Sequence, residues 1–160
     1  MSMVADVYRI AAADAARMDG DQYAKLLAYD NREAVRVELE KSWHGLHYLL
    51  TGSAWDAAGP LAFLAAGGEA VAGADGGYGP ARLLSVEETR QVHSALSSIG
   101  DEQLWSRFDA EDMFTQGVYP EIWDEPEEEL KDEYLSYFQG LKKLVAEAAG
   151  QGDCLLVYLS

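Results

Sequence analysis

The sequence predicts one α/β domain over residues 1–160, with α+β as the alternative, in which helices pack around a central mixed sheet of about four to five strands. Residues 3–10 and 154–159, near the two ends of the chain, are apolar in the manner of buried strands. Residues 35–40 alternate strictly between apolar and charged side chains, as a strand with one buried face does. Between these segments, apolar residues recur at helical spacing.

The first third of the chain alternates between predicted strands and helices. Residues 3–10 have apolar side chains on both faces, which favours an interior strand. Residues 11–18 and 22–28 are predicted to form two short helices separated near Gly20. The alternating strand over residues 35–40 leads directly into the next helix.

That next helix is predicted to begin near Trp43 and to end at Gly52, because glycine readily adopts the left-handed conformation that closes a helix. Trp43, Leu46, His47 and Leu50 are spaced i, i+3, i+4 and i+7, so they share one side of the helix. We therefore expect one buried apolar face, with His47 on it.

The middle of the chain combines glycine-rich loops with a well-marked helix. Residues 73–80 contain neither Gly-x-Gly-x-x-Gly nor the Lys-Ser/Thr ending of a P-loop. We expect a structural turn with several positive φ angles there, and a flexible active-site edge is the alternative. Residues 82–84 are predicted to form a short strand. Ser85 and Glu88 have the spacing of a capping box, which predicts a helix over residues 86–98.

The last third is dominated by one long helix. Before the long helix, a short helix is predicted to begin at Asp101, which would cap it. Apolar residues keep a helical period over residues 127–149, and Gly150 is expected to end that helix. Residues 154–159 then form a continuous apolar segment, which predicts a central strand with Cys154 buried in it.

The composition is strongly acidic. The chain has 28 acidic against 12 basic residues and a formal net charge of −16. Such a surface repels phosphate backbones, so we expect no nucleic-acid partner. It is compatible with a basic protein partner or a cation, and it also keeps a protein in solution.

Several features predict a cytoplasmic protein with no membrane partner. Apolar runs long enough to span a bilayer are absent from the sequence, and residues 1–6 lack the basic start and apolar core of a signal peptide. Cys154 is the single cysteine, so the chain cannot form an internal disulfide, as is usual in a reducing compartment. The sequence contains no cofactor-binding signature.

Two of the three histidines lie in the predicted helix that begins near Trp43. His47 is interpreted either as a pocket-lining acid, base or ligand or as a core histidine bonded to the backbone. His44 and His47 could share a metal ion from positions i and i+3, but no third ligand follows at suitable spacing, so no metal site is expected.

A candidate pocket follows if the histidine helix, the glycine-rich loop and the irregular segment around Tyr119 meet in the fold. Unlike segments that bring together His, Asp, Tyr and Trp can orient a small molecule. The alternative is that the glycines and Pro120 only shape turns. The candidate residues are Trp43, His44, His47, Asp75, Gly76, Tyr119 and Trp123.

Three motifs resemble a known family: Lys41-Ser42-Trp43-His44-Gly45-Leu46-His47-Tyr48-Leu49-Leu50-Thr51-Gly52, Asp75-Gly76-Gly77-Tyr78-Gly79-Pro80-Ala81-Arg82, and Val118-Tyr119-Pro120 ahead of Ile122-Trp123. With the closing helix and strand, they make the chain similar to the bacterial DUF1877, or YfbM-like, family over nearly its whole length. The resemblance implies helices around a central sheet. It implies no activity, because the function of that family is unknown.

Two function classes remain open from the sequence. We expect a small acidic binding protein that neutralises or regulates a basic protein partner, because the charge favours it and no nucleophile motif is present. The alternative is a hydrolase or transferase acting on a small molecule in a pocket near His47, Asp75 and Tyr119.

Overall fold

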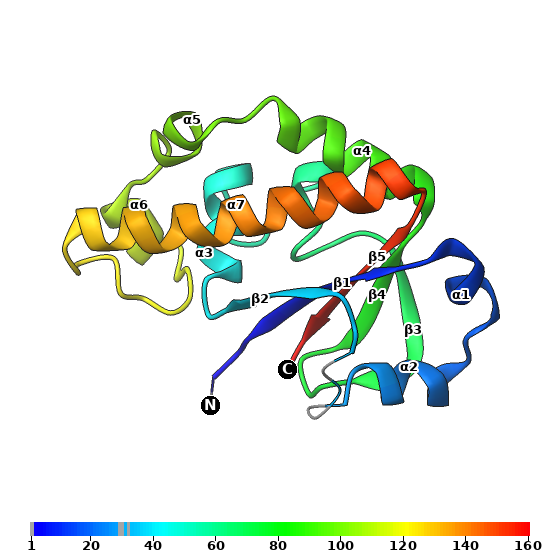
Figure 1. Ribbon diagram of the computed structural model, residues 1–160. Helices are drawn as coiled ribbons and strands as arrows, with labels where there is room; N and C mark the ends of the chain where they lie inside the picture. Colours follow the sequence, from blue (N-terminus) through cyan, green and yellow to red (C-terminus); the bar gives the residue numbers. More distant parts are fainter. Residues whose placement is uncertain (1, 29–30, 32) are drawn as a thin grey trace.

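The computed structural model describes residues 2–28, 31 and 33–160, and its centre is a five-stranded sheet (Figure 1). The strand order is β2-β1-β5-β4-β3. This confirms the predicted α/β class, at the upper end of the expected strand number. The strands are β1 (Ala5–Ile10), β2 (Arg36–Glu40), β3 (Glu69–Asp75), β4 (Pro80–Leu84) and β5 (Cys154–Leu159).

The pairing of the strands differs from the prediction. Every strand pair in the described part of the chain is antiparallel, so the expected mixed sheet is wrong in this respect. β3 and β4 are joined by a short hairpin, and β5 lies between β1 and β4 and runs opposite to both. Parallel neighbours would require repeated β–α–β crossovers, which this chain does not make.

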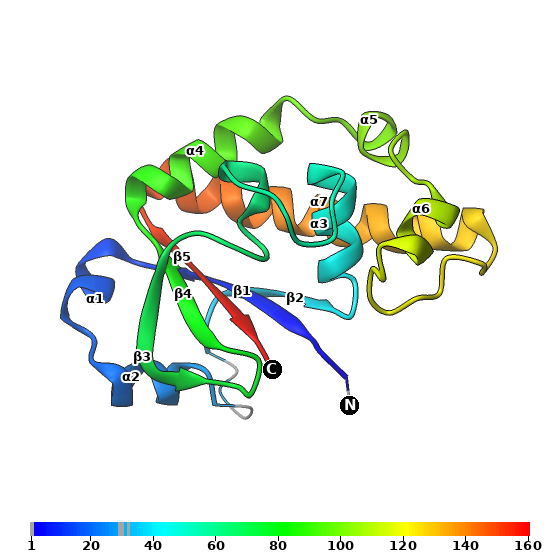
Figure 2. The ribbon, with the colours of Figure 1, turned by 180° about the vertical axis from the view of Figure 1, so that it is seen from behind.

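Helices cover both faces of the sheet, as Figures 1 and 2 show. Two short helices, α1 (Ala12–Arg17) and α2 (Gly20–Leu26), lie on one side. The other side holds a 3₁₀ turn over Pro60–Ala62 and the helices α3 (Trp43–Thr51), α4 (Val86–Ser97), α5 (Asp101–Trp105), α6 (Ala110–Thr115) and α7 (Glu127–Gln151). In the described part of the chain, no helix combines the length and the apolar character needed to cross a membrane.

Strand alternation assigns each side chain to one of these two faces. Ala5 and Val7 of β1 belong to the large core under α3 and α7, whereas Tyr8 belongs to the smaller core beside α2. Cys154 is buried in the middle strand, as predicted.

Helix α3 is buried on all sides, not on one face as the sequence predicted. Trp43, Leu46 and Leu50 are core residues, as expected, but every residue from Trp43 to Leu50 is buried. A helix that is surrounded by other elements has no solvent-exposed face. The spacing of its apolar residues therefore predicts fewer buried positions than the structure contains. Gly52 closes it with a φ of 79°, as predicted.

Two predicted helix boundaries are wrong by one or two residues. Gly100, not Asp101, is the N-cap of α5, and Asp101 is its first residue. α7 continues through Gly150 and closes at Gly152, which has a φ of 67°. The capping box of Ser85 and Glu88 is present as predicted. A helix ends where a left-handed residue can satisfy its last carbonyl groups, and either glycine meets that local requirement.

Gly45 allows α3 to touch two aromatic rings. A Cβ atom at this position would lie 2.6 Å from Cε2 of Tyr134 and 2.8 Å from Cη2 of Trp123. We expect Gly45→Ala to lower the free energy of unfolding by about 1–2 kcal/mol, because overpacking outweighs the helix propensity gained.

The matched control is Gly140→Ala in α7, where the added Cβ would meet only Cγ2 of Val37, at 3.4 Å. This substitution should raise the free energy of unfolding by about 0.5–1 kcal/mol. Urea unfolding of both variants measures the two effects, and equal signs would show that the contact with Tyr134 does not constrain the helix.

Candidate functional site

His44 joins three separate segments of the chain through its ring. Its Nδ1 accepts a hydrogen bond from the backbone N–H of Tyr119 at 2.9 Å. The neutral ring therefore has its proton on Nε2, which donates to the carbonyl oxygen of Ala54 at 2.8 Å. Burial lowers the pKa of His44, which favours this neutral form. Both ring nitrogens are thus committed to backbone groups.

His47 is fully buried and its two ring nitrogens have no hydrogen-bond partner in the described part of the chain. Burial, with smaller contributions from the nearby His44 and Arg82, lowers its pKa to about 4. The ring is therefore neutral at physiological pH. Among the described residues, no group of three His, Cys, Asp or Glu side chains is placed to hold a metal ion.

Tyr119 and Trp123 hold the segment after α6 against the rest of the protein. The Tyr119 hydroxyl accepts from the backbone N–H of Met3 at 3.1 Å. Trp123 is buried, and its Nε1 donates to the carbonyl oxygen of Val118 at 2.9 Å. The histidine helix and the Tyr119 segment therefore meet, as the sequence hypothesis required.

Asp75 and Gly76 lie elsewhere, on the β3–β4 hairpin. The Asp75 carboxylate accepts from the backbone N–H of Gly77, and Gly77 and Gly79 have positive φ, as predicted for a structural turn. At Gly76 a Cβ would lie 2.6 Å from the carbonyl oxygen of Leu159, so glycine lets the hairpin approach β5. Asp75 lines the largest cavity described below, whose wall contains neither a residue of α3 nor Tyr119.

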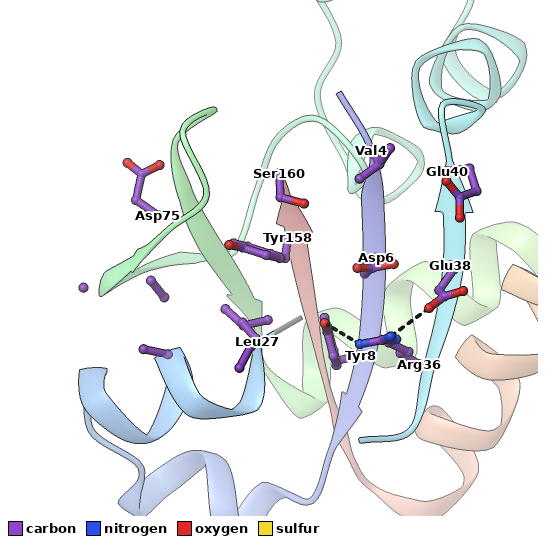
Figure 3. Close-up of a pocket in the computed structure, with 14 residues that line it drawn as sticks. Val4, Asp6, Tyr8, Leu27, Arg36, Glu38, Glu40, Asp75, Tyr158 and Ser160 are labelled. Atoms are coloured by element: carbon purple, nitrogen blue, oxygen red, sulfur yellow. Dashed lines mark hydrogen bonds and ion pairs between the residues drawn. The ribbon is translucent and has the colours of Figure 1, made fainter. Parts of the chain in front are cut away.

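This cavity, of about 690 Å³, lies on the face of the sheet that carries α2 (Figure 3). Its floor is made by side chains that alternate outward from β1, β2 and β5. α2 and the β3–β4 hairpin supply the remaining walls. The chemically distinctive residues of the wall are Asp6, Arg36, Glu38, Glu40, Asp75 and Tyr158.

Among the described residues of this wall, Arg36 is the one cation, and four residues carry carboxylates. The guanidinium of Arg36 already forms an ion pair with one of these carboxylates. Its Nη2 donates to Glu38 at 2.7 Å and its Nη1 donates to the Tyr8 hydroxyl at 3.2 Å, as the dashed lines of Figure 3 show. Asp6 forms no ion pair with any residue that the structure describes.

The surroundings of Asp6 in this wall change its pKa. The pKa of Asp6 is raised to about 6, mainly by partial burial; Arg36 opposes the rise, and Glu38 and Glu40 add to it. A carboxyl group with this pKa is half ionised near pH 6 and mostly ionised at pH 7. A cation entering the cavity would favour its ionised form and relieve the repulsion among the carboxylates.

The sequence carries a signal for this site in the positions of the charged residues in β1 and β2. The charged residues of β2, from Arg36 to Glu40, were predicted to share one face, and Asp6 is the one acidic residue of β1, a mainly apolar strand that also contains Arg9. Strand pairing places Asp6 opposite Glu38. That register cannot be deduced from either segment alone, so the pair was missed.

Comparison with known proteins addresses the family and the fold. The solved crystal structure of YfbM from Escherichia coli, described as a protein of unknown function, is similar with a TM-score of 0.67 and 22% identity, over 98% of this chain and 99% of that one. The comparison with curated proteins finds no match. The sequence profile of the family described as a domain of unknown function, DUF1877, matches residues 1–158. The chain therefore belongs to the DUF1877 family.

Proposed function

We propose that this protein is a binding protein that holds a basic side chain, lysine or arginine, of a protein partner in the acidic cavity beside α2. The observation that carries the proposal is the wall of that cavity, whose described residues include four carboxylates and one guanidinium that is already paired. An incoming cation would favour the ionised form of Asp6, whose pKa is raised to about 6.

The overall charge supports this proposal because it should raise the association rate of a basic partner. A net charge of −16 attracts a basic partner over a distance of about one Debye length, and a concave acidic site then fixes where the cation binds. The partly exposed Tyr158 lines the same cavity, so the apolar stem of a lysine or arginine has aromatic surface to pack on.

The test compares two ligands of equal charge, an amidated N-acetyl-trilysine peptide and spermidine, by calorimetry at about 0.15 M salt. We expect Asp6→Asn to weaken binding of the peptide about tenfold, as loss of one partly buried charge contact does. The matched control is Asp132→Asn on α7, which changes the net charge equally on an exposed helix surface and should alter affinity less than about twofold.

The affinity for the cation should change with pH in one direction. Because the cation binds the ionised form of Asp6, affinity should fall as pH falls through about 6. Tighter binding of spermidine than of the peptide would assign the cavity to small amines. Equal effects of Asp6→Asn and Asp132→Asn would reduce the binding to general charge attraction and reject the cavity as the site.

The same substitution should stabilise the free protein. The pKa of Asp6 is higher in the folded chain than its ordinary value of 3.8, so the free energy of unfolding falls as pH rises through about 6. Asp6→Asn should therefore raise the free energy of unfolding at pH 8 by about 1 kcal/mol, after allowance for solvent screening. The gain should vanish near pH 4, and urea unfolding at the two pH values measures it.

A further inference from the structure

A second cavity, of about 480 Å³, lies on the opposite face of the sheet. Strand alternation separates the two: Tyr158 faces the acidic cavity, whereas Val157 and Leu159 line the second one. The β3–β4 hairpin borders both cavities, with Asp75 on one side and Tyr78 on the other. A volume of this size is ordinary for a small-molecule site.

The chemistry of the second cavity is the reverse of the first. None of the described residues in its walls is acidic, although the protein has 28 acidic residues. They are mainly apolar and aromatic, and Trp43, Trp55 and Tyr78 contribute rings. Trp55 is 55% exposed, which is unusual for so large an apolar side chain, and its ring centroid lies 4.4 Å from that of His44.

Arg82 is the one charged residue among the described residues that line this cavity, and it is partly buried. Its Nη1 donates to the carbonyl oxygen of Gly67 at 2.7 Å and its Nη2 to that of Phe63 at 2.9 Å. These bonds use two of the five N–H donors of the guanidinium. Arg82 forms no ion pair within the part of the chain that the structure describes, so its charge has no nearby counter-ion there.

We propose that this cavity binds a small planar apolar molecule that carries a carboxylate or similar anionic group, with the anion on Arg82 and the apolar body against Trp55 and Tyr78. A guanidinium presents its donors in a planar fork that matches a carboxylate. An aromatic wall favours a flat apolar body. The net charge of −16 disfavours anions in general, so Arg82, which has no ion-pair partner among the described residues, is what gives an anion a place to bind.

The probe is 1-naphthoate, and its neutral control of the same shape is 1-naphthamide. Binding is measured by calorimetry and by the NMR shift of the Trp55 indole N–H at about 0.15 M salt. We expect 1-naphthoate to bind at least about tenfold more tightly than 1-naphthamide, because the hydrogen bonds to Arg82 become charge-assisted on both sides. Arg82→Gln should abolish that preference.

Trp55→Ala keeps the test valid if Arg82→Gln does not fold, since Trp55 is exposed. It should weaken 1-naphthoate about tenfold. Asp6→Asn, in the acidic cavity, should leave the affinity within about twofold, which separates this inference from the proposed function. The proposal is overturned if 1-naphthoate fails to bind at millimolar concentration, if the amide binds equally well, or if neither Trp55→Ala nor Arg82→Gln changes the affinity.

Discussion

Trp43→Ala is expected to lower the free energy of unfolding by about 3–5 kcal/mol, the largest effect of any single substitution considered for this protein. Trp43 is 0% exposed and lies in the large core. Its Nε1 donates to the carbonyl oxygen of Met3 at 3.2 Å, and its ring stacks on His44 with centroids 4.9 Å apart. Truncation removes the apolar contacts, leaves a cavity and breaks a hydrogen bond between α3 and the start of the chain.

Trp55→Ala is the matched control because it removes the same side chain a few residues away. Trp55 also lies beside His44 but is 55% exposed, so its loss should cost less than about 1 kcal/mol. Guanidinium unfolding followed by circular dichroism compares the two variants. Similar costs would mean that the aromatic stack on His44, rather than burial, determines the contribution of Trp43.

His47 should make the protein lose stability in mild acid. The imidazole pKa is about 4 in the folded protein and 6.5 in the unfolded chain. Between these values the unfolded chain takes up a proton that the folded protein rejects. The free energy of unfolding therefore falls as pH falls through 6.5 towards 4, by about 2–3 kcal/mol at about pH 4.5. Above 6.5 the ring is neutral in both states and its contribution is constant.

His47→Leu removes this dependence while retaining a side chain of similar size. At pH 7.5 the variant should be as stable as the wild type or more stable, by about 1–3 kcal/mol, because two unsatisfied ring nitrogens leave the core. The stability difference between variant and wild type should then widen by about 2–3 kcal/mol at about pH 4.5.

Asp6 has a raised pKa and acts in the opposite direction within the same pH window, so both proteins should carry Asp6→Asn. Urea unfolding at several pH values provides the measurement, and the interval from pH 7.5 to 8.5 is the internal control. A difference that stays constant down to about pH 4.5 would show that the folded and unfolded chains protonate His47 equally.

The sequence by itself determined most of the local structure of this protein. The bounds of β5 agree with the prediction, and the Ser85 capping box and the closure of α3 at Gly52 are present. Periodicity also identified Trp43, Leu46 and Leu50 as core. These features follow from hydrogen bonds and side-chain spacings within a few residues, which the order of the residues specifies directly.

The candidate site was predicted less completely. His44 and Tyr119 do meet, but the contact uses the histidine ring to bind backbone groups. Whether His47, Asp75 and Tyr119 form one enzymatic pocket stays a prediction, and the structure places Asp75 in the wall of the acidic cavity. A histidine pattern in a sequence looks the same whether its nitrogens face a ligand or a carbonyl oxygen.

Only the tertiary structure decided which charged residues share a cavity. Asp6 and Glu38 come together through the register of β1 and β2, and Asp75 reaches the same wall because the β3–β4 hairpin closely approaches the end of β5 at Gly76. The second cavity likewise joins Met3, Trp55 and Arg82 from three distant segments. Strand order and register depend on how the whole apolar surface packs, so residue spacing fixes which face a side chain takes and the assembled sheet fixes its neighbours.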